Sequence, residues 1–69
     1  MDKNFIDYQR GGYGFRDFEN AYANGVEVYE IDDKGNPHLV AEVADKTVDD
    51  IEEMTETEFA YFLAENGVL

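Results

Sequence analysis

Apolar residues recur along the chain with two different spacings, and these spacings predict five short elements. In residues 15–24, Phe15, Phe18 and Tyr22 occupy positions i, i+3 and i+7, which places side chains on one face of a helix. An Asn-Gly pair follows as a helix stop signal. Residues 15–24 are therefore predicted to form a helix.

The following residues change to the alternating pattern that is typical of β-strands. Residues 26–31 (VEVYEI) and 38–44 (HLVAEVA) are rich in Val, and in the second run Leu39, Ala41 and Val43 are expected on one side. The DDKGNP segment between the runs has the composition of a turn. The two runs therefore predict a β-hairpin with a longer loop.

Two helix starts follow the hairpin. Thr55 stands three residues before Glu58, the spacing of a capping box, in which the two side chains satisfy free backbone N–H groups of the first turn. Thr47 and Asp50 form a weaker version of the same motif. Apolar residues line one side of each predicted helix: Val48, Ile51 and Met54 in the first, and Phe59, Phe62 and Leu63 in the second, which ends at Asn66-Gly67.

The residues before these elements are less regular. Residues 4–9 (NFIDYQ) are compatible with a short helix or with an extended arm. The GGYG segment at 11–14 is a flexible break, because glycine tolerates backbone angles that other residues avoid. It is interpreted as a hinge or a turn, with an exposed Gly-Tyr loop that contacts a partner as the alternative. It lacks the spacing of a dinucleotide-binding fingerprint.

Together the elements predict one α+β domain over residues 1–69, in which a β-hairpin, or a small antiparallel sheet, is packed by about three short helices. Two strands alone are marginally stable, so the helices are expected to cover one face of the hairpin. Aromatic residues make up 14% of the chain and are expected to supply the core. The candidates are Phe5, Phe15, Phe18, Tyr22, Tyr29, Phe59, Tyr61 and Phe62.

The net charge of the chain limits the classes of ligand that it can bind. Seventeen acidic residues against five basic ones give a formal net charge of -12. This charge argues against DNA, RNA and anionic lipid as direct ligands and favours a basic partner surface, with solubility alone as the alternative. The chain has no signal-peptide pattern, no apolar run long enough to span a membrane and no cysteine, so a cytoplasmic location is expected.

Residues suited to catalysis or metal binding are few. The chain has no Ser, no Cys and a single His, so no Ser-His or Cys-His pair can form and no enzyme activity is expected. When Gly35 is aligned with the glycine of an EF-hand loop, Lys34 and Ala41 fall at ligand positions, which favours a plain turn. His38 is expected at a strand edge. No cofactor or metal is therefore expected.

Residues 47–59 (TVDDIEEMTETEF) contain six carboxylates and no basic residue. Four of the carboxylates lie in the first turns of the two predicted helices, where the helix dipole stabilises each by roughly 0.3–1 kcal/mol at an exposed site. Glu52 and Glu53 gain little from the dipole, and no Lys or Arg stands three or four residues away. We therefore expect a binding partner to account for them.

Carboxylates three and four residues apart are neighbours on a helix, with their stems about 5–6 Å apart. They present repeated negative charge, as a nucleic-acid backbone does, and would attract the Lys and Arg residues of a surface that holds DNA. The candidate binding residues are Asp49, Glu52, Glu53 and Glu56 in one row, and Glu30, Asp32 and Asp33 near the turn as a second acidic site.

In its length, its charge and this acidic row, the chain resembles phage-encoded DNA mimics, which include anti-restriction proteins, uracil-DNA glycosylase inhibitors and anti-CRISPR proteins. It is most similar to the anti-CRISPR group in size. The resemblance implies an inhibitor in the host bacterial cytoplasm, a monomer or weak dimer that occupies the DNA-binding or PAM-reading surface of a CRISPR effector subunit or a similar basic protein. Lys3, Arg10 and Arg16 depart from this pattern, which would confine mimicry to one face.

Two other functions fit the same sequence. One is an acidic adaptor or antitoxin-like protein that binds a basic partner without imitating DNA. The other is a small phage structural protein, for which self-assembly at high concentration is expected.

Overall fold

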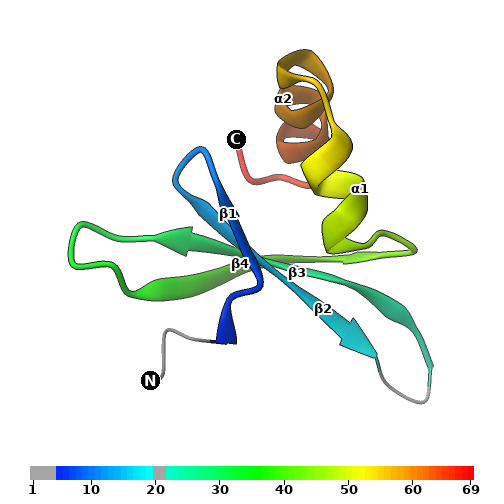
Figure 1. Cartoon of the computed structure of the whole chain (residues 1–69), viewed down its shortest axis with the longest axis horizontal. Coiled ribbons are helices and arrows are strands. Elements are labelled where there is room, and N and C mark those ends of the chain that lie inside the picture. The colour runs from blue at the N-terminus through cyan, green and yellow to red at the C-terminus, as the bar shows by residue number, and fades with distance from the viewer. Residues whose placement is uncertain (1–4, 20–21) are drawn as a thin grey trace.

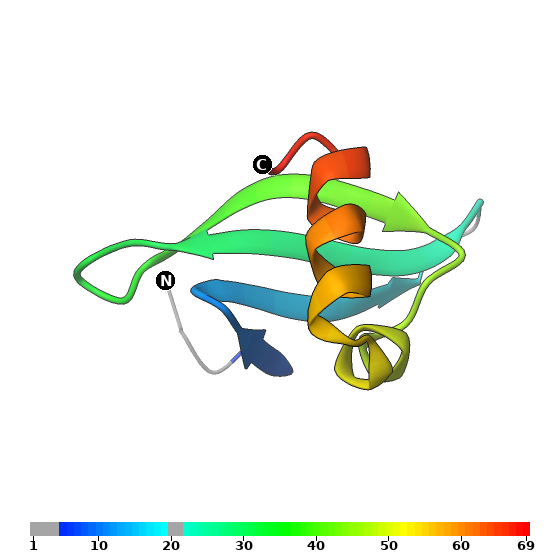
Figure 2. The same ribbon diagram turned by 90° about the horizontal axis from the view of Figure 1, so that it is seen from above.

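A computed structural model describes residues 5–19 and 22–69 and shows an antiparallel four-stranded sheet with two helices over one of its faces (Figures 1 and 2). Each strand pairs with the next one in the chain, so the order in the sheet is β1-β2-β3-β4. Figure 2 shows α2 running across the strands, with α1 beside it on the side of β1. The elements are β1 (Tyr8–Arg10), β2 (Tyr13–Glu19), β3 (Asn24–Ile31), β4 (Pro37–Ala44), α1 (Val48–Glu53) and α2 (Glu56–Glu65).

The prediction of a helix over residues 15–24 was wrong, because this part of the chain contains strand β2 and the start of β3. Phe15 lies opposite Val28 in the ladder and is completely buried, whereas Phe18 lies opposite Gly25 and points to the other face. Pairing with β3 therefore overrides a spacing that also suits a helix. Residues 20 and 21 of the predicted helix lie outside the described residues.

The GGYG segment begins with the turn that joins β1 to β2. Gly11 and Gly12 are the two central residues between the paired residues Arg10 and Tyr13, and both have positive φ angles, 59° and 84°. This combination is that of a type I′ turn, which matches the twist of the two strands and favours Gly-Gly. The turn interpretation is confirmed, and residues 8–10 are extended rather than helical.

The predicted hairpin of residues 26–31 and 38–44 is confirmed by β3 and β4. The predicted alignment of Leu39 with Ala41 and Val43 was wrong. Val28 pairs with Ala41 but Tyr29 pairs with Leu39, so one extra residue of β4 forms a bulge. The bulge moves Leu39 away from the core, and this side chain is 50% exposed.

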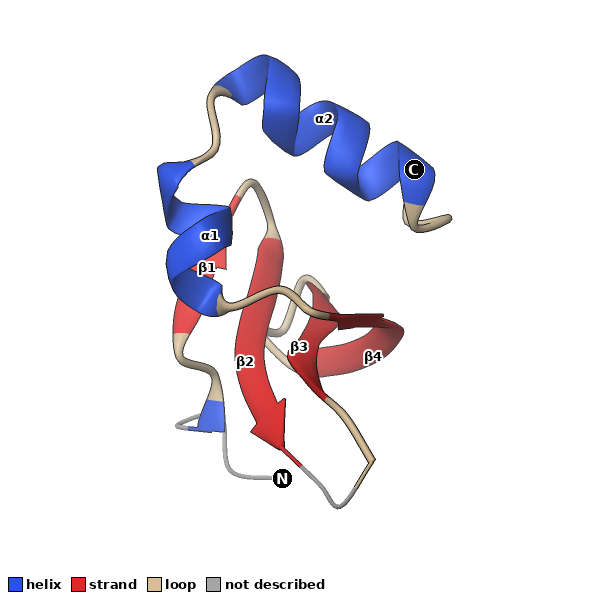
Figure 3. Ribbon diagram, turned by 90° about the vertical axis from the view of Figure 1, so that its right-hand side faces the viewer, coloured by secondary structure: helices blue, strands red, loops and turns tan. Residues whose placement is uncertain are grey.

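Both predicted capping boxes are present, with Thr47 and Asp50 at the start of α1 and Thr55 and Glu58 at the start of α2. Met54 has an extended backbone (φ -65°, ψ 138°), which ends α1 and separates the two helices. Figure 3 shows the change of direction at this point. The described residues therefore form two helices, not about three, because the third was predicted where β2 lies.

The core lies between the sheet and the helices. Of the predicted core aromatics, Phe5 and Phe18 are half-buried, whereas Tyr22 and Tyr61 are 97% and 66% exposed and do not belong to it. Tyr29 is buried on the opposite face of the sheet, where the ring of Phe5 meets it edge-on at 5.1 Å between centroids. The core cluster consists of Phe15, Val26, Val28, Val48, Ile51, Phe59, Phe62 and Leu63.

Neither helix of the described residues has the length and apolar character that crossing a membrane requires.

Candidate functional site

Helix α1 carries four exposed carboxylates; Asp50 caps the start of the helix, and the other three lie on the side that faces away from the sheet. Its apolar residues Val48 and Ile51 are buried against the core, and Val48 N–H donates to Asp17 Oδ1 on β2 at 2.8 Å. With that side anchored, the helical repeat directs Asp49, Glu52 and Glu53 to solvent. This orientation follows from the spacing of the apolar pair alone.

These three carboxylates, named here the α1 acidic face, form no hydrogen bond or ion pair with any described residue. Asp49 lies in the first turn, where the helix dipole favours it. Glu52 and Glu53 lie in the last turn, which contains no basic residue. Among the described residues, the fold therefore gives Glu52 and Glu53 no ion pair.

The spacing predicted that Glu56 continues this row on the same helix. This prediction was wrong, because α1 ends at Glu53. Glu56 is the first residue of α2, and its Oε1 accepts a hydrogen bond from Arg10 Nη2 at 3.1 Å. The other terminal nitrogen of Arg10 donates to Ile51 O at 2.9 Å. Arg10 thus joins β1 to both helices, and its charge opposes that of Glu56.

Two further carboxylates of the 47–59 segment serve the helix ends. Asp50 accepts from Thr47 N–H at 2.9 Å, and Glu58 accepts from Thr55 N–H at 2.9 Å. The hydrogen bonds from Thr55 hold the pKa of Glu58 below its usual value. These acids are explained by helix capping rather than by a partner.

Glu53 also lines an open groove between α1 and α2, together with Asp50, Met54 and Glu58. The fifth lining residue is Lys46, which forms no ion pair within 4.0 Å in the described part of the chain. The groove therefore brings three carboxylates from two helices around one lysine.

The second predicted acidic site lies at the β3–β4 turn. Asp32 organises this turn, because its Oδ1 accepts from the N–H groups of Lys34 and Asn36 at 2.9 and 2.8 Å. Its other oxygen lies 2.8 Å from His38 Nε2, and this hydrogen bond is the main cause that lowers the pKa of Asp32. Asp32 therefore has a structural role.

Glu30 and Asp33 are exposed and make no hydrogen bond or ion pair with the described residues. In Figures 1 and 2 the turn projects from one end of the sheet, while α1 lies toward the other end. The structure thus separates the two predicted acidic sites into two surfaces.

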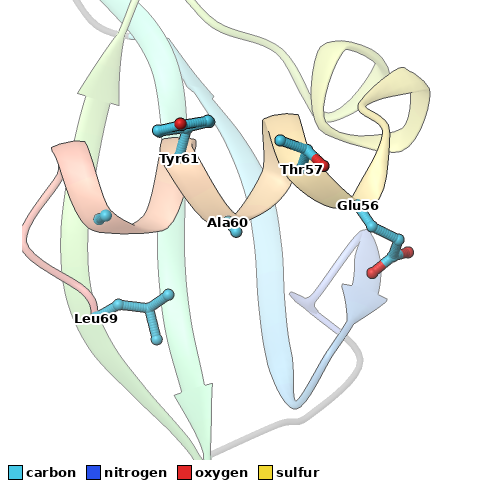
Figure 4. A pocket seen from close by; sticks show the side chains of 6 residues that line it. Glu56, Thr57, Ala60, Tyr61 and Leu69 are labelled. Carbon is cyan, nitrogen blue, oxygen red and sulfur yellow. The ribbon is translucent and has the colours of Figure 1, made fainter.

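An apolar groove on the outer side of α2 was not predicted from the sequence (Figure 4). It has a volume of about 580 Å³, and its largest side chains, Tyr61 and Leu69, are 66% and 71% exposed. The signal was present in the sequence: with Phe59, Phe62 and Leu63 turned inward, Tyr61 must face outward. The lining residues are Glu56, Thr57, Ala60, Tyr61, Ala64 and Leu69.

Glu56 lines this groove at the start of α2. The α1 acidic face lies on the preceding helix, so the two helices carry both the groove and the acidic face. Exposed tyrosine beside apolar surface is typical of protein contacts, whereas unpaired carboxylates select a basic partner. The described residues contain no group of three or more His, Cys, Asp or Glu side chains arranged to hold a metal ion. The exposed Tyr61, the apolar groove and the unpaired carboxylates together have the features of a protein-binding surface.

Comparisons of the chain with protein-family models, with curated protein sequences and with solved structures give no match.

Proposed function

We propose that the protein is an inhibitor that binds the basic nucleic-acid-binding surface of a host defence complex by imitating DNA. In the form suggested by its resemblance to anti-CRISPR proteins, it blocks the binding of target DNA or of the PAM. The α1 acidic face is the proposed contact, and no catalysis or cofactor is invoked.

The observation that carries this proposal is that Asp49, Glu52 and Glu53 are exposed and unpaired on a helix anchored by its other side. The anchoring by Val48 and Ile51 fixes the helix backbone that carries these carboxylates before binding, which lowers the entropic cost of association. The net charge of -12 extends the attraction beyond direct contacts and raises the rate of encounter with a basic surface.

An acidic adaptor that does not imitate DNA is the second candidate. It is favoured by the apolar groove on α2, because Tyr61 and Leu69 offer contact area that a phosphate backbone does not. The two candidates differ in competition: a DNA mimic must be displaced by duplex DNA, whereas an adaptor that uses the α2 groove need not be.

The test is a pull-down from bacterial lysate with the tagged protein, eluted first with short duplex DNA and then with a salt step. Three baits are compared: the natural chain, the double variant Glu52→Lys with Glu53→Lys, and the control Asp33→Lys with Glu65→Lys. The control makes the same change in net charge at two exposed carboxylates outside the α1 acidic face: Asp33 of the second acidic site, between β3 and β4, and Glu65 at the end of α2.

We expect duplex DNA to elute a nucleic-acid-binding complex from the natural chain and from the control. The α1 variant should retain that complex at least about tenfold more weakly, because two like charges would face its basic residues. Release by salt alone would favour the adaptor. Equal losses with both variants would show that binding does not depend on the α1 acidic face in particular, and that overall charge or the second acidic site contributes as much.

A further inference from the structure

The two edges of the sheet differ in how far they are covered. Strand β1 has three residues, and α1 lies beside it, joined through the hydrogen bond from Arg10 to Ile51 O. Strand β4 has eight residues and forms the opposite edge. Among the described residues, the backbone of residues 38–44 makes hydrogen bonds only with β3. The edge of β4 is therefore open.

The ladder shows which peptide groups of β4 point outward. Asp45 N–H donates to Asn24 O at 2.9 Å, and Val43 lies opposite Val26. Because peptide groups alternate in direction along an antiparallel strand, Val43 shares the direction of Asp45 toward β3. Glu42 and Ala44 then direct their N–H and C=O groups away from the sheet, where a further strand could pair with them.

Part of this edge is already protected against pairing. Pro37 lacks an N–H group, and the bulge near Val40 interrupts the regular ladder at the turn end of β4. Residues 41–44 have neither device and carry no lysine, and β4 ends before Asp45, whose φ angle is positive (63°). The regular and unprotected part of the edge is therefore residues 41–44.

The charge of this segment selects its partner. The side chains of Glu42 and Asp45 are exposed and form no hydrogen bond or ion pair with the described residues. Glu27 lies directly across from Glu42 on β3. A second copy of the chain would bring its own Glu42 and Asp45 to the same edge, and like charges on paired strands are destabilising. A strand with Lys or Arg at alternate positions would instead place a cation beside Glu42.

We propose that residues 41–44 of β4 dock an extended basic segment of a partner protein by β-strand addition. Backbone hydrogen bonds to Glu42 and Ala44 would hold the segment, and the unpaired carboxylates would select its charge. This surface is the edge of the sheet opposite β1, the strand beside which α1 lies, and the proposal does not depend on the proposed function of the α1 acidic face.

The test is an NMR titration of the ¹⁵N-labelled full chain with three heptapeptides of blocked ends. The first alternates Lys and Val, the second alternates Glu and Val, and the third has the charge of the first with two of its Val residues replaced by Pro. Proline removes N–H donors from the peptide but leaves its charge unchanged.

We expect saturable amide shifts, centred on residues 39–45, with the Lys-Val peptide. The Pro peptide should bind at least tenfold more weakly, and the Glu-Val peptide should cause no shifts. Equal binding of both basic peptides, shifts centred on α1, or no shifts would overturn the proposal. Concentration-dependent shifts of β4 without peptide would also overturn it, because they would make a second copy the occupant.

Two variants complete the test. Ala44→Pro removes an outward N–H group without touching the ladder to β3, and it should weaken Lys-Val binding at least tenfold. Glu42→Lys leaves the backbone intact and should weaken it several-fold, which keeps the proposal testable if the proline variant does not fold. Unchanged binding by Glu42→Lys would show that charge does not select the segment.

Discussion

The guanidinium of Arg10 on β1 lies over the ring of Phe59 on α2, with Cζ 4.4 Å from the ring centroid. The same side chain is only 16% exposed, and it donates to Ile51 O at 2.9 Å. One cation therefore joins the first strand to both helices, across 41 and 49 residues of sequence.

Replacement of Arg10 by Met should destabilise the fold. Met keeps an apolar stem over Phe59 but loses the cation–π contact, worth roughly 0.5–2 kcal/mol, and a charged hydrogen bond worth about 1.5–3 kcal/mol. We expect a loss of about 2–4 kcal/mol in the free energy of unfolding, measured by urea denaturation. The control Glu56→Gln should change stability little, since this partner is 93% exposed. If the two variants lost equal free energy of unfolding, Arg10 would stabilise the fold mainly through its ion pair with Glu56.

Phe62 and Tyr61 are neighbours in sequence with opposite environments, 5% and 66% exposed. Phe62→Ala should cost about 3–5 kcal/mol, because it leaves a cavity between α2 and the sheet. That loss can exceed the stability of so small a fold. Tyr61→Ala should leave the thermal transition nearly unchanged. Comparable shifts in the two melting curves would contradict the assignment of faces on α2.

Gly25→Ala should destabilise the sheet. A Cβ at this position would clash with Val43 O and approach Phe18 Cε1 to 2.9 Å. Overpacking of this kind costs about 1–3 kcal/mol. Gly67→Ala is the control, because a Cβ there meets no atom within 4 Å and the only cost is a positive φ angle of 73°. Calorimetry should rank Gly25→Ala as the more damaging, and the reverse order would show that β3 and β4 separate easily.

The capping box of α2 should make stability depend on pH. The pKa of Glu58 is lowered in the folded chain, so its contribution is complete above the unfolded pKa and is lost as pH falls through the folded pKa. Compared with Glu58→Gln, the natural chain should have its largest advantage in Tm near pH 7. That advantage should disappear in acid. An advantage that persists at pH 2 would exclude the charge of Glu58 as its source.

Charge repulsion predicts that Glu52→Lys with Glu53→Lys unfolds at the same temperature as the natural chain or at a higher one. Both positions lie in the last turn of α1, where the helix dipole favours cations. Added salt should raise the Tm of the natural chain more than that of the variant, because salt screens the repulsion that the variant has already reduced. A lower Tm for the variant at low salt would contradict this account.

Helices α1 and α2 and the hairpin of β3 and β4 were predictable because local sequence signals determine them. The capping threonines Thr47 and Thr55, and the inward residues that follow them, fix where α1 and α2 begin and which side they bury. The exposed position of Glu52 and Glu53 follows from the same spacing. These features depend on residues within a few positions of one another.

Features that depend on distant residues were not predictable. Phe15, Phe18 and Tyr22 fit a helical spacing, and only pairing with β3 makes their segment a strand. The bulge that turns Leu39 outward is visible only in the register with β3. The contact of Glu56 with Arg10, 46 residues away, depends in turn on the course of β1.

The order β1-β2-β3-β4 has a consequence for synthesis on the ribosome. Each strand pairs with its predecessor, so the sheet can assemble progressively as the chain emerges, with short loops to close. The helices follow the strands, so Phe15, Val26 and Val28 stay uncovered until α1 and α2 have emerged. A nascent chain stalled near residue 46 would expose this apolar face, and it would be a substrate for chaperones until translation resumed.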